Sequence, residues 1–353
     1  HRLHAQGGAA ARQALWARAV SRQYLSSLHA LALPAGRWRH RGYRFAAGAA
    51  AAALALCLMA AAAVTTPARL PASAAAPASS SGPQAVPDGA LLAVTSTTVL
   101  ADWLQELGGA RWQVRALLAP GAHAHAFEPS PADAAWVERA RLVVLVGQGL
   151  EGPALSRLML RARSRSRVVE LAPGLGGDPH FWTSVPLAMQ AVRELEGVLR
   201  ELDPEGAEGY RSRARAYLAQ LEELDRWIRA RLSEVAPKSR LVVTSHPFLE
   251  PFIQEYGLRG VGSLVQGGAD LDQLSAGQLA RLTDRLRQAG VRVMFTDSAV
   301  PAPAVRQLAR ALGARVVQLH SDSLGPAGSG AATYLEYMRT NVSRVVEALG
   351  RGR

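Results

Sequence analysis

Short apolar runs alternate with amphipathic helical patterns along most of the chain, and this alternation restricts the possible folds more than any other feature. Two series of four runs have the length and composition of buried strands, and helical patterns separate the runs. The expected strands span residues 91–95, 113–119, 142–147, 167–172, 241–245, 258–265, 291–296 and 314–319. Strands that alternate with helices form parallel sheets covered on both faces, so the sequence predicts two doubly wound α/β lobes.

One long helical pattern joins the two series. It begins at Asp203-Pro204, and its apolar residues recur every three or four positions as far as Val235. A helix over residues 204–235 would be about 48 Å long at 1.5 Å per residue. We therefore expect it to pack against both lobes. The shorter expected helices span residues 99–107, 131–139, 153–162, 248–256, 275–289, 302–312 and 333–349.

The N-terminal part of the chain differs from the rest in charge and composition. Residues 1–44 contain eight arginines and no acidic residue, so they account for most of the net charge of +12. The folded part is therefore not expected to bind nucleic acid. Residues 65–89 consist largely of Pro, Ala and Ser, which is typical of a flexible linker.

An uncharged, Ala-rich run covers residues 45–64 and follows several arginines. This arrangement is typical of a secretory signal peptide or of a signal-anchor, and the length of the run fits both. The chain is therefore expected to be exported and to contact the membrane through its N-terminal segment. The single cysteine, Cys57, lies in this run and excludes an intramolecular disulfide. Lipidation of Cys57 is disfavoured because Leu56, which is not small, precedes it.

Several histidines follow directly after expected strands. His123 and His125 lie in a turn-forming segment that ends at a helix start, where Ser130 can cap the helix, Pro131 fits its first position and Asp133 can complete a capping box. Strand ends also precede the remaining candidates, which are His180, His246, His320 and Asp322. In open α/β sheets, the loops at the carboxyl ends of the strands converge and bind ligands. We therefore expect side chains from distant loops to meet between the lobes.

The segments around these residues resemble the solute-binding proteins of zinc and manganese ABC importers. The resemblance rests on residues 120–131 (PGAHAHAFEPSP), 178–182 (DPHFW), 245–248 (SHPF) and 321–325 (SDSLG), and it extends from about residue 91 to residue 349. His123 and Ala124 depart from the family pattern, which usually has Asp-Pro at these two positions. The resemblance implies two lobes joined by a backbone helix, with a metal site in the cleft between them, in a clamp that moves little.

The resemblance also implies the metal ligands, which would be His125, His180, His246 and Asp322. His123 could be a group behind the ligands, an alternative ligand or only a loop residue, and Glu128 is expected to order its loop. Asp297 stands where the family often has Glu, and we expect a structural role or a role behind the ligands. His320 is expected to be structural.

Three imidazoles and one carboxylate favour zinc, with manganese as the alternative ion. A site closed by four protein ligands leaves no position for a reactive water, so the chain is expected to bind metal and not to be an enzyme. The expected partners are an ABC permease and its separate ATPase subunit, and the chain is expected to be a monomer. A zinc hydrolase with Asp322 as base and a surface adhesin are the alternatives, but no Ser-His-Asp or His-Glu-x-x-His pattern supports hydrolysis.

These features predict six segments in order. Residues 1–44 form a basic extension, residues 45–64 a signal peptide or anchor, and residues 65–89 a linker. Residues 90–203 form the N-terminal metal-binding lobe, residues 204–236 the connecting helix, and residues 237–350 the C-terminal metal-binding lobe.

Overall fold

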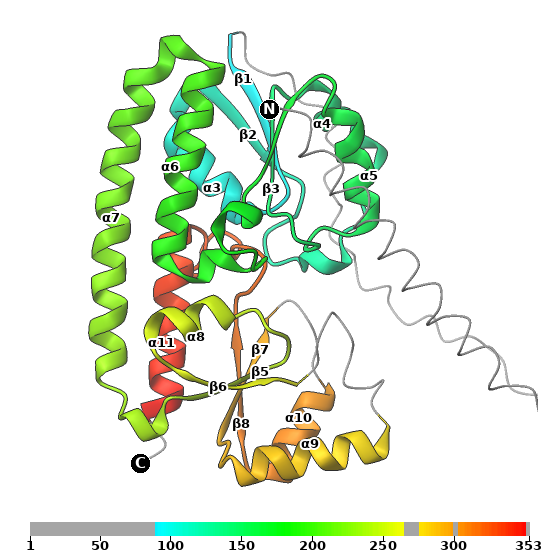
Figure 1. The fold of residues 1–353 in the computed structure, drawn as a ribbon, viewed down its shortest axis with the longest axis vertical. Helices are drawn as coiled ribbons and strands as arrows, with labels where there is room; N and C mark the ends of the chain where they lie inside the picture. Colours follow the sequence, from blue (N-terminus) through cyan, green and yellow to red (C-terminus); the bar gives the residue numbers. More distant parts are fainter. Residues whose placement is uncertain (1–88, 265–274, 299–302, 351–353) are drawn as a thin grey trace, which may run out of the picture. The chain divides into compact units, whose positions relative to one another are not determined.

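The computed structural model describes residues 89–264, 275–298 and 303–350. The predicted basic extension, the apolar run and nearly all of the linker lie outside these residues. The described chain contains two four-stranded sheets, each entirely parallel, with strand orders β2-β1-β3-β4 and β6-β5-β7-β8 (Figure 1). Two parallel-sheet α/β lobes were predicted, and the structure confirms this fold class.

The first lobe contains β1 (Leu91–Thr95), β2 (Trp112–Ala116), β3 (Leu142–Leu145) and β4 (Arg167–Glu170). Its helices are α3 (Thr98–Gly108), α4 (Pro131–Arg139), α5 (Pro153–Ala162) and α6 (Val185–Leu202). The central strand β3 is completely buried, because its four residues are all Leu or Val and helices cover both faces of the sheet. Ser130 and Asp133 form the predicted capping box, with Pro131 as the first residue of α4.

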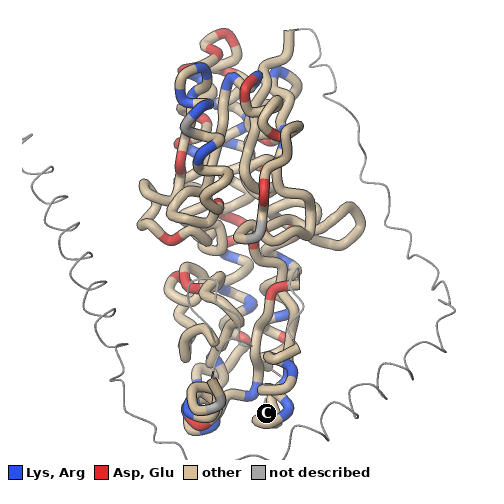
Figure 2. The backbone as a smooth tube through the Cα atoms, turned by 90° about the vertical axis from the view of Figure 1, so that its right-hand side faces the viewer, with Lys and Arg blue, Asp and Glu red and all other residues tan. Residues whose placement is uncertain are grey.

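The second lobe repeats this plan with β5 (Leu241–Thr244), β6 (Arg259–Ser263), β7 (Val293–Asp297) and β8 (Arg315–Leu319). Its helices are α8 (Glu250–Tyr256), α9 (Ala276–Gln288), α10 (Pro303–Leu312) and α11 (Tyr334–Gly350). Basic and acidic residues are interspersed along the backbone of both lobes (Figure 2).

The helix α7 (Ala207–Ser233) runs beside both lobes (Figure 1). Its buried residues recur at the predicted spacing and are Tyr210, Ala214, Tyr217, Leu221, Leu224, Ile228 and Leu232. They belong to one apolar core that includes residues of both lobes. The helix is shorter than predicted, because a 3-10 turn at Pro204–Gly206 precedes it. Its 27 residues correspond to about 40 Å.

The sequence analysis missed α6, which packs directly against α7. Ser184 caps its first turn, and Pro186 fits there because the first turn needs no backbone donor. Ala188, Ala191, Val192, Leu195 and Leu199 form its buried face at helical spacing, so the signal was present in the sequence. The connection between the lobes therefore consists of two packed helices that turn at Asp203.

Predicted strands extended beyond the observed strands mainly at their carboxyl ends. The ladder hydrogen bonds nevertheless continue past the assigned ends, as between Leu117 N and Thr95 O (2.8 Å) and between Leu171 N and Leu145 O (3.1 Å). The loops that carry the candidate metal ligands begin at these positions, so the strands fix where each loop starts. Among the described residues, no helix has both the length and the apolar composition needed to cross a membrane.

Candidate metal site

Each candidate ligand lies in a loop that follows the carboxyl end of a parallel strand. His125 lies in the short turn Ala124–Ala126 after β2, and His180 directly precedes the turn Phe181–Thr183 after β4. His246 follows β5, and Asp322 follows β8. The first two loops belong to the first lobe and the last two to the second lobe. The structure thus brings all four predicted ligands to the position where such folds bind ligands.

The four side chains converge on one point. One ligand atom from each of His125, His180, His246 and Asp322 lies within 4.8 Å of all the others. The imidazole centroids are 5.7 Å apart for His125 and His180, 5.9 Å for His125 and His246, and 5.6 Å for His180 and His246. Rings at these separations can place their nitrogens around a single ion.

Three buried polar atoms of these four side chains make no hydrogen bond to any described residue. They are His180 Nε2, His246 Nε2 and Asp322 Oδ1. His180 Nε2 lies 3.5 Å from Asp322 Oδ1, close enough for an ion to contact both atoms. Buried polar atoms normally have partners, because an unsatisfied one costs about 1–3 kcal/mol. A cation bound between these atoms would satisfy all three.

The backbone around Asp322 is held by loops of the opposite lobe. Gly121 N donates to Leu324 O (2.8 Å), Ser323 Oγ donates to Ala122 O (2.8 Å), and Leu324 N donates to Thr98 Oγ1 (2.7 Å). Gly121 has a φ of 76°, a conformation that favours glycine, at the turn that leads into the histidine loop. The two lobes therefore fix this part of the site together.

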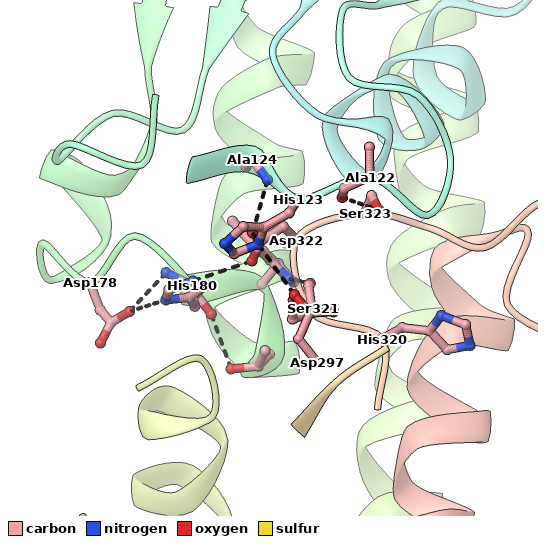
Figure 3. A network of polar contacts seen from close by, with 12 residues as sticks. Ala122, His123, Ala124, Asp178, His180, Asp297, His320, Ser321, Asp322 and Ser323 are labelled. Carbon is pink, nitrogen blue, oxygen red and sulfur yellow. Dashed lines mark hydrogen bonds and ion pairs between the residues drawn. The ribbon is translucent and has the colours of Figure 1, made fainter. Parts of the chain in front are cut away.

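The segment after His180 is anchored in the same way. Trp182 Nε1 donates to Ser321 O (3.2 Å), and Tyr334 Oη donates to Trp182 O (2.7 Å). Trp182 is fully buried, as expected of a packing residue in the wall of the site. On the solvent side, Asp178 Oδ1 accepts the backbone N–H of His180 at 2.8 Å (Figure 3).

Local electrostatics prepare the imidazoles for metal binding. Burial lowers the pKa of His246 to about 4, despite the opposing effect of Asp322. Partial burial also lowers the pKa of His125, although its residue is the most exposed of the four. Neutral imidazole is the form that binds metal, so these two rings are available as ligands at neutral pH.

The two oxygens of Asp322 have different surroundings. Oδ2 accepts the Ala124 N–H at 3.0 Å and lies 2.6 Å from His123 Nδ1, whereas Oδ1 is among the unsatisfied atoms (Figure 3). Burial alone would raise the pKa of Asp322, but the contacts with His123 and His180 outweigh it and hold the pKa well below its usual range. Asp322 is therefore a carboxylate at neutral pH.

A second group overlaps the first and consists of His123, Asp297 and Asp322. His123 Nδ1 lies 3.3 Å from Asp297 Oδ2, which also accepts the Ser321 hydroxyl at 2.6 Å. Burial lowers the pKa of His123, but the close contacts with Asp297 and Asp322 outweigh this effect and raise the pKa to about 10. His123 thus contacts two carboxylates of the opposite lobe.

Glu128 and His320 belong to neither group. Glu128 is exposed and lies in the loop just before α4. The backbone of His320 is held by Asn341, which accepts the His320 N–H at 3.0 Å and donates to the His320 carbonyl at 2.8 Å. The motifs of the sequence did not identify Ser321 or Tyr334 as supports of the site. The position of Ser321 next to Asp322 could have pointed to Ser321.

Comparison with known proteins identifies the family. Residues 93–348 match the family model ZnuA, described as zinc-uptake complex component A periplasmic. The chain belongs to the ZnuA family. Its members are solute-binding proteins of zinc and manganese ABC importers, so this chain is an extracytoplasmic metal-binding receptor and not an enzyme. The zinc hydrolase alternative is therefore wrong.

Individual ZnuA-family relatives bind different metals. The chain is 31% identical over 268 residues to the manganese-binding lipoprotein MntA of Halalkalibacterium halodurans. The aligned region covers 73% of this chain and 88% of that protein. The chain is 29% identical over 283 residues to the zinc-binding protein TroA of Treponema pallidum, covering 76% and 91%. The solved structure of TroA superimposes with a TM-score of 0.68 at 25% identity, covering 74% of this chain and all of that one.

Proposed function

We propose that this receptor captures one zinc ion with His125, His180, His246 and Asp322 and delivers it to an ABC permease driven by a separate ATPase subunit. The observation that carries the proposal is the convergence of three imidazoles and one carboxylate, with three of their atoms buried and without hydrogen bonds. Zinc is usually bound by four ligands in a tetrahedral arrangement, and imidazole suits it well.

Manganese is the alternative ion, and the similarity to MntA favours it as much as the similarity to TroA favours zinc. Manganese prefers oxygen ligands and a six-coordinate arrangement. In this site the nitrogen ligands outnumber the carboxylate by three to one, which supports zinc. Competition between the two ions, after removal of bound metal with a chelator, discriminates between them.

The receptor is further proposed to act as a monomer at the outer face of the cytoplasmic membrane. Residues 45–64 would either direct export and be removed or stay as an anchor, and the basic residues before them would contact the membrane surface. Residues 65–89 would then give the metal-binding part freedom to reach the permease. Mass spectrometry of the mature N-terminus separates removal of residues 45–64 from anchoring.

Replacement of His180 tests the ligand set. In His180→Ala, the affinity for zinc should fall by at least about 100-fold, because the ion loses one of its four protein ligands. Isothermal titration calorimetry measures the change. The matched control is His320→Ala, which removes another strand-end histidine that belongs to neither group. An unchanged affinity in His180→Ala would remove His180 from the site.

A further inference from the structure

His123 is placed to control how Asp322 binds a metal ion. It lies in the first-lobe loop, two residues before His125, and its side chain is 24% exposed. Its ring centroid lies 5.1 Å from that of His125 and 5.7 Å from that of His246. Its Nδ1 nevertheless faces Asp322 and Asp297 of the second lobe (Figure 3). The ring therefore borders the four candidate ligands, with this nitrogen turned towards the two carboxylates.

The contacts of Asp322 divide its carboxylate into two unequal oxygens. A carboxylate oxygen has about two acceptor positions. At Oδ2, the Ala124 N–H occupies one at 3.0 Å, and His123 Nδ1 lies against the same oxygen in an ion-pair contact of 2.6 Å. Oδ1 is buried, makes no hydrogen bond to a described residue, and lies 3.5 Å from His180 Nε2. Oδ1 is thus the oxygen that faces the candidate ligands, whereas His123 covers Oδ2.

Asp297 holds His123 in this orientation. Its Oδ2 lies 3.3 Å from His123 Nδ1 and accepts a hydrogen bond from Ser321 at 2.6 Å. Asp297 is almost completely buried at the end of β7. If the His123 ring turned its Nδ1 towards the ion, it would lose its contacts with both carboxylates. These contacts hold His123 behind Asp322.

We propose that His123 is a specificity-determining positioning residue, which occupies Oδ2 of Asp322 so that the carboxylate gives the ion a single oxygen. This inference rests on the proposed ligand set. With one oxygen and three imidazole nitrogens, the ion has four protein ligands, the number that zinc takes in closed sites. Manganese, which prefers octahedral oxygen coordination, would gain from the second oxygen that His123 withholds.

Two substitutions of His123 separate this role from a general structural one. His123→Ala removes the ring nitrogen that contacts Oδ2, whereas the side-chain amide of His123→Asn can place a nitrogen near the position of Nδ1. The backbone N–H of Ala124 stays in both variants. His320→Ala is the control for loss of a neighbouring histidine. Zinc and manganese affinities are measured for all four proteins by competition titration, and the readout is the ratio of the two dissociation constants.

We expect His123→Ala to lower the preference for zinc over manganese by about 10-fold or more, within the range found for groups that support metal ligands. His123→Asn should restore most of the preference, and His320→Ala should leave it unchanged. The proposal is overturned if the wild type binds zinc and the ratio is the same in His123→Ala. If the wild type binds neither ion, the proposed function itself fails, and this outcome is distinct from the first.

X-ray absorption at the zinc edge tests the same proposal on the wild type. The result does not depend on whether the His123 variants fold. We expect four atoms around zinc, of which three belong to imidazoles. A fifth atom from Asp322 Oδ2 would overturn the proposal, because the carboxylate would then bind through both oxygens. Four imidazoles would overturn it as well, because His123 would then be a ligand.

Discussion

The two lobes share one architecture but contribute different chemistry to the site. Of the four candidate ligands, the first lobe contributes the imidazoles of His125 and His180, and the second lobe contributes the imidazole of His246 and the carboxylate of Asp322. Both acids of the overlapping group, Asp297 and Asp322, also belong to the second lobe. Within these two groups, the carboxylates thus belong to the second lobe, and two of the three candidate imidazole ligands belong to the first.

Because of this difference, neither lobe contains all four candidate ligands. The first lobe alone would offer two imidazoles, and the second lobe alone would offer one imidazole and one carboxylate. Hydrogen bonds between the lobes hold the two halves of the site in place. Examples are those from Ala124 N to Asp322 and from Trp182 Nε1 to Ser321. Tight binding therefore depends on the contribution of both lobes and on the contacts between them.

The largest effect is expected when the second lobe loses its charge. In Asp322→Asn the shape of the side chain is kept, but the anionic ligand is lost, and zinc affinity should fall by at least about 1000-fold, or about 4 kcal/mol. Calorimetric titration measures the loss. The matched control is Asp284→Asn, which neutralises an exposed acid of α9 in the same lobe and far from the ligand set. A small loss in Asp322→Asn would show that the imidazoles hold the ion without the carboxylate.

A partly buried acid where the lobes meet should give the next largest effect. Asp102 of α3 accepts the backbone N–H of Tyr334 at the start of α11 (3.1 Å). Burial raises the pKa of Asp102 to about 6, while the Tyr334 hydrogen bond opposes the shift. A carboxyl whose pKa is raised on folding stabilises the protein below its unfolded pKa and loses this contribution as the pH rises through its folded pKa.

Relative to Asp102→Asn, the wild type should therefore lose up to about 3 kcal/mol of unfolding free energy between about pH 4 and pH 7. Urea unfolding of both proteins across this pH range measures the difference. Other titrating groups are present in both proteins, so their effects on the unfolding free energy cancel in the difference. A difference that does not change with pH would mean that Asp102 has the same pKa in the folded and unfolded chains.

A single interlobe hydrogen bond should give the smallest effect. Tyr334→Phe removes the hydroxyl that donates to Trp182 O (2.7 Å) and leaves this buried carbonyl without that donor. The free energy of unfolding should fall by about 1 kcal/mol. Chemical denaturation measures the loss. Tyr337→Phe is a second test, because the Tyr337 hydroxyl accepts the Trp182 Nε1–H of the first lobe at 3.3 Å. No loss in either variant would show that packing alone joins the lobes here.

Local patterns in the sequence predicted the lobes and the positions of the four converging residues, because each strand and each motif is a continuous segment. The pairing of Ala124 with Asp322 joins residues 198 positions apart, and no local pattern encodes it. The role of His123 could not be predicted for the same reason. Its contacts depend on Asp297 at the end of β7 and on Asp322 in the loop after β8, which the fold brings together. In contrast, α6 had a readable helical pattern.

The central claim is that one ion is held by both lobes at once, and a crystal structure of the metal-loaded protein with anomalous data at the zinc edge tests it most directly. We predict one anomalous peak about 2.0–2.2 Å from a nitrogen of each of His125, His180 and His246 and from one oxygen of Asp322. A peak coordinated by residues of a single lobe, or a peak away from these four side chains, would contradict the account.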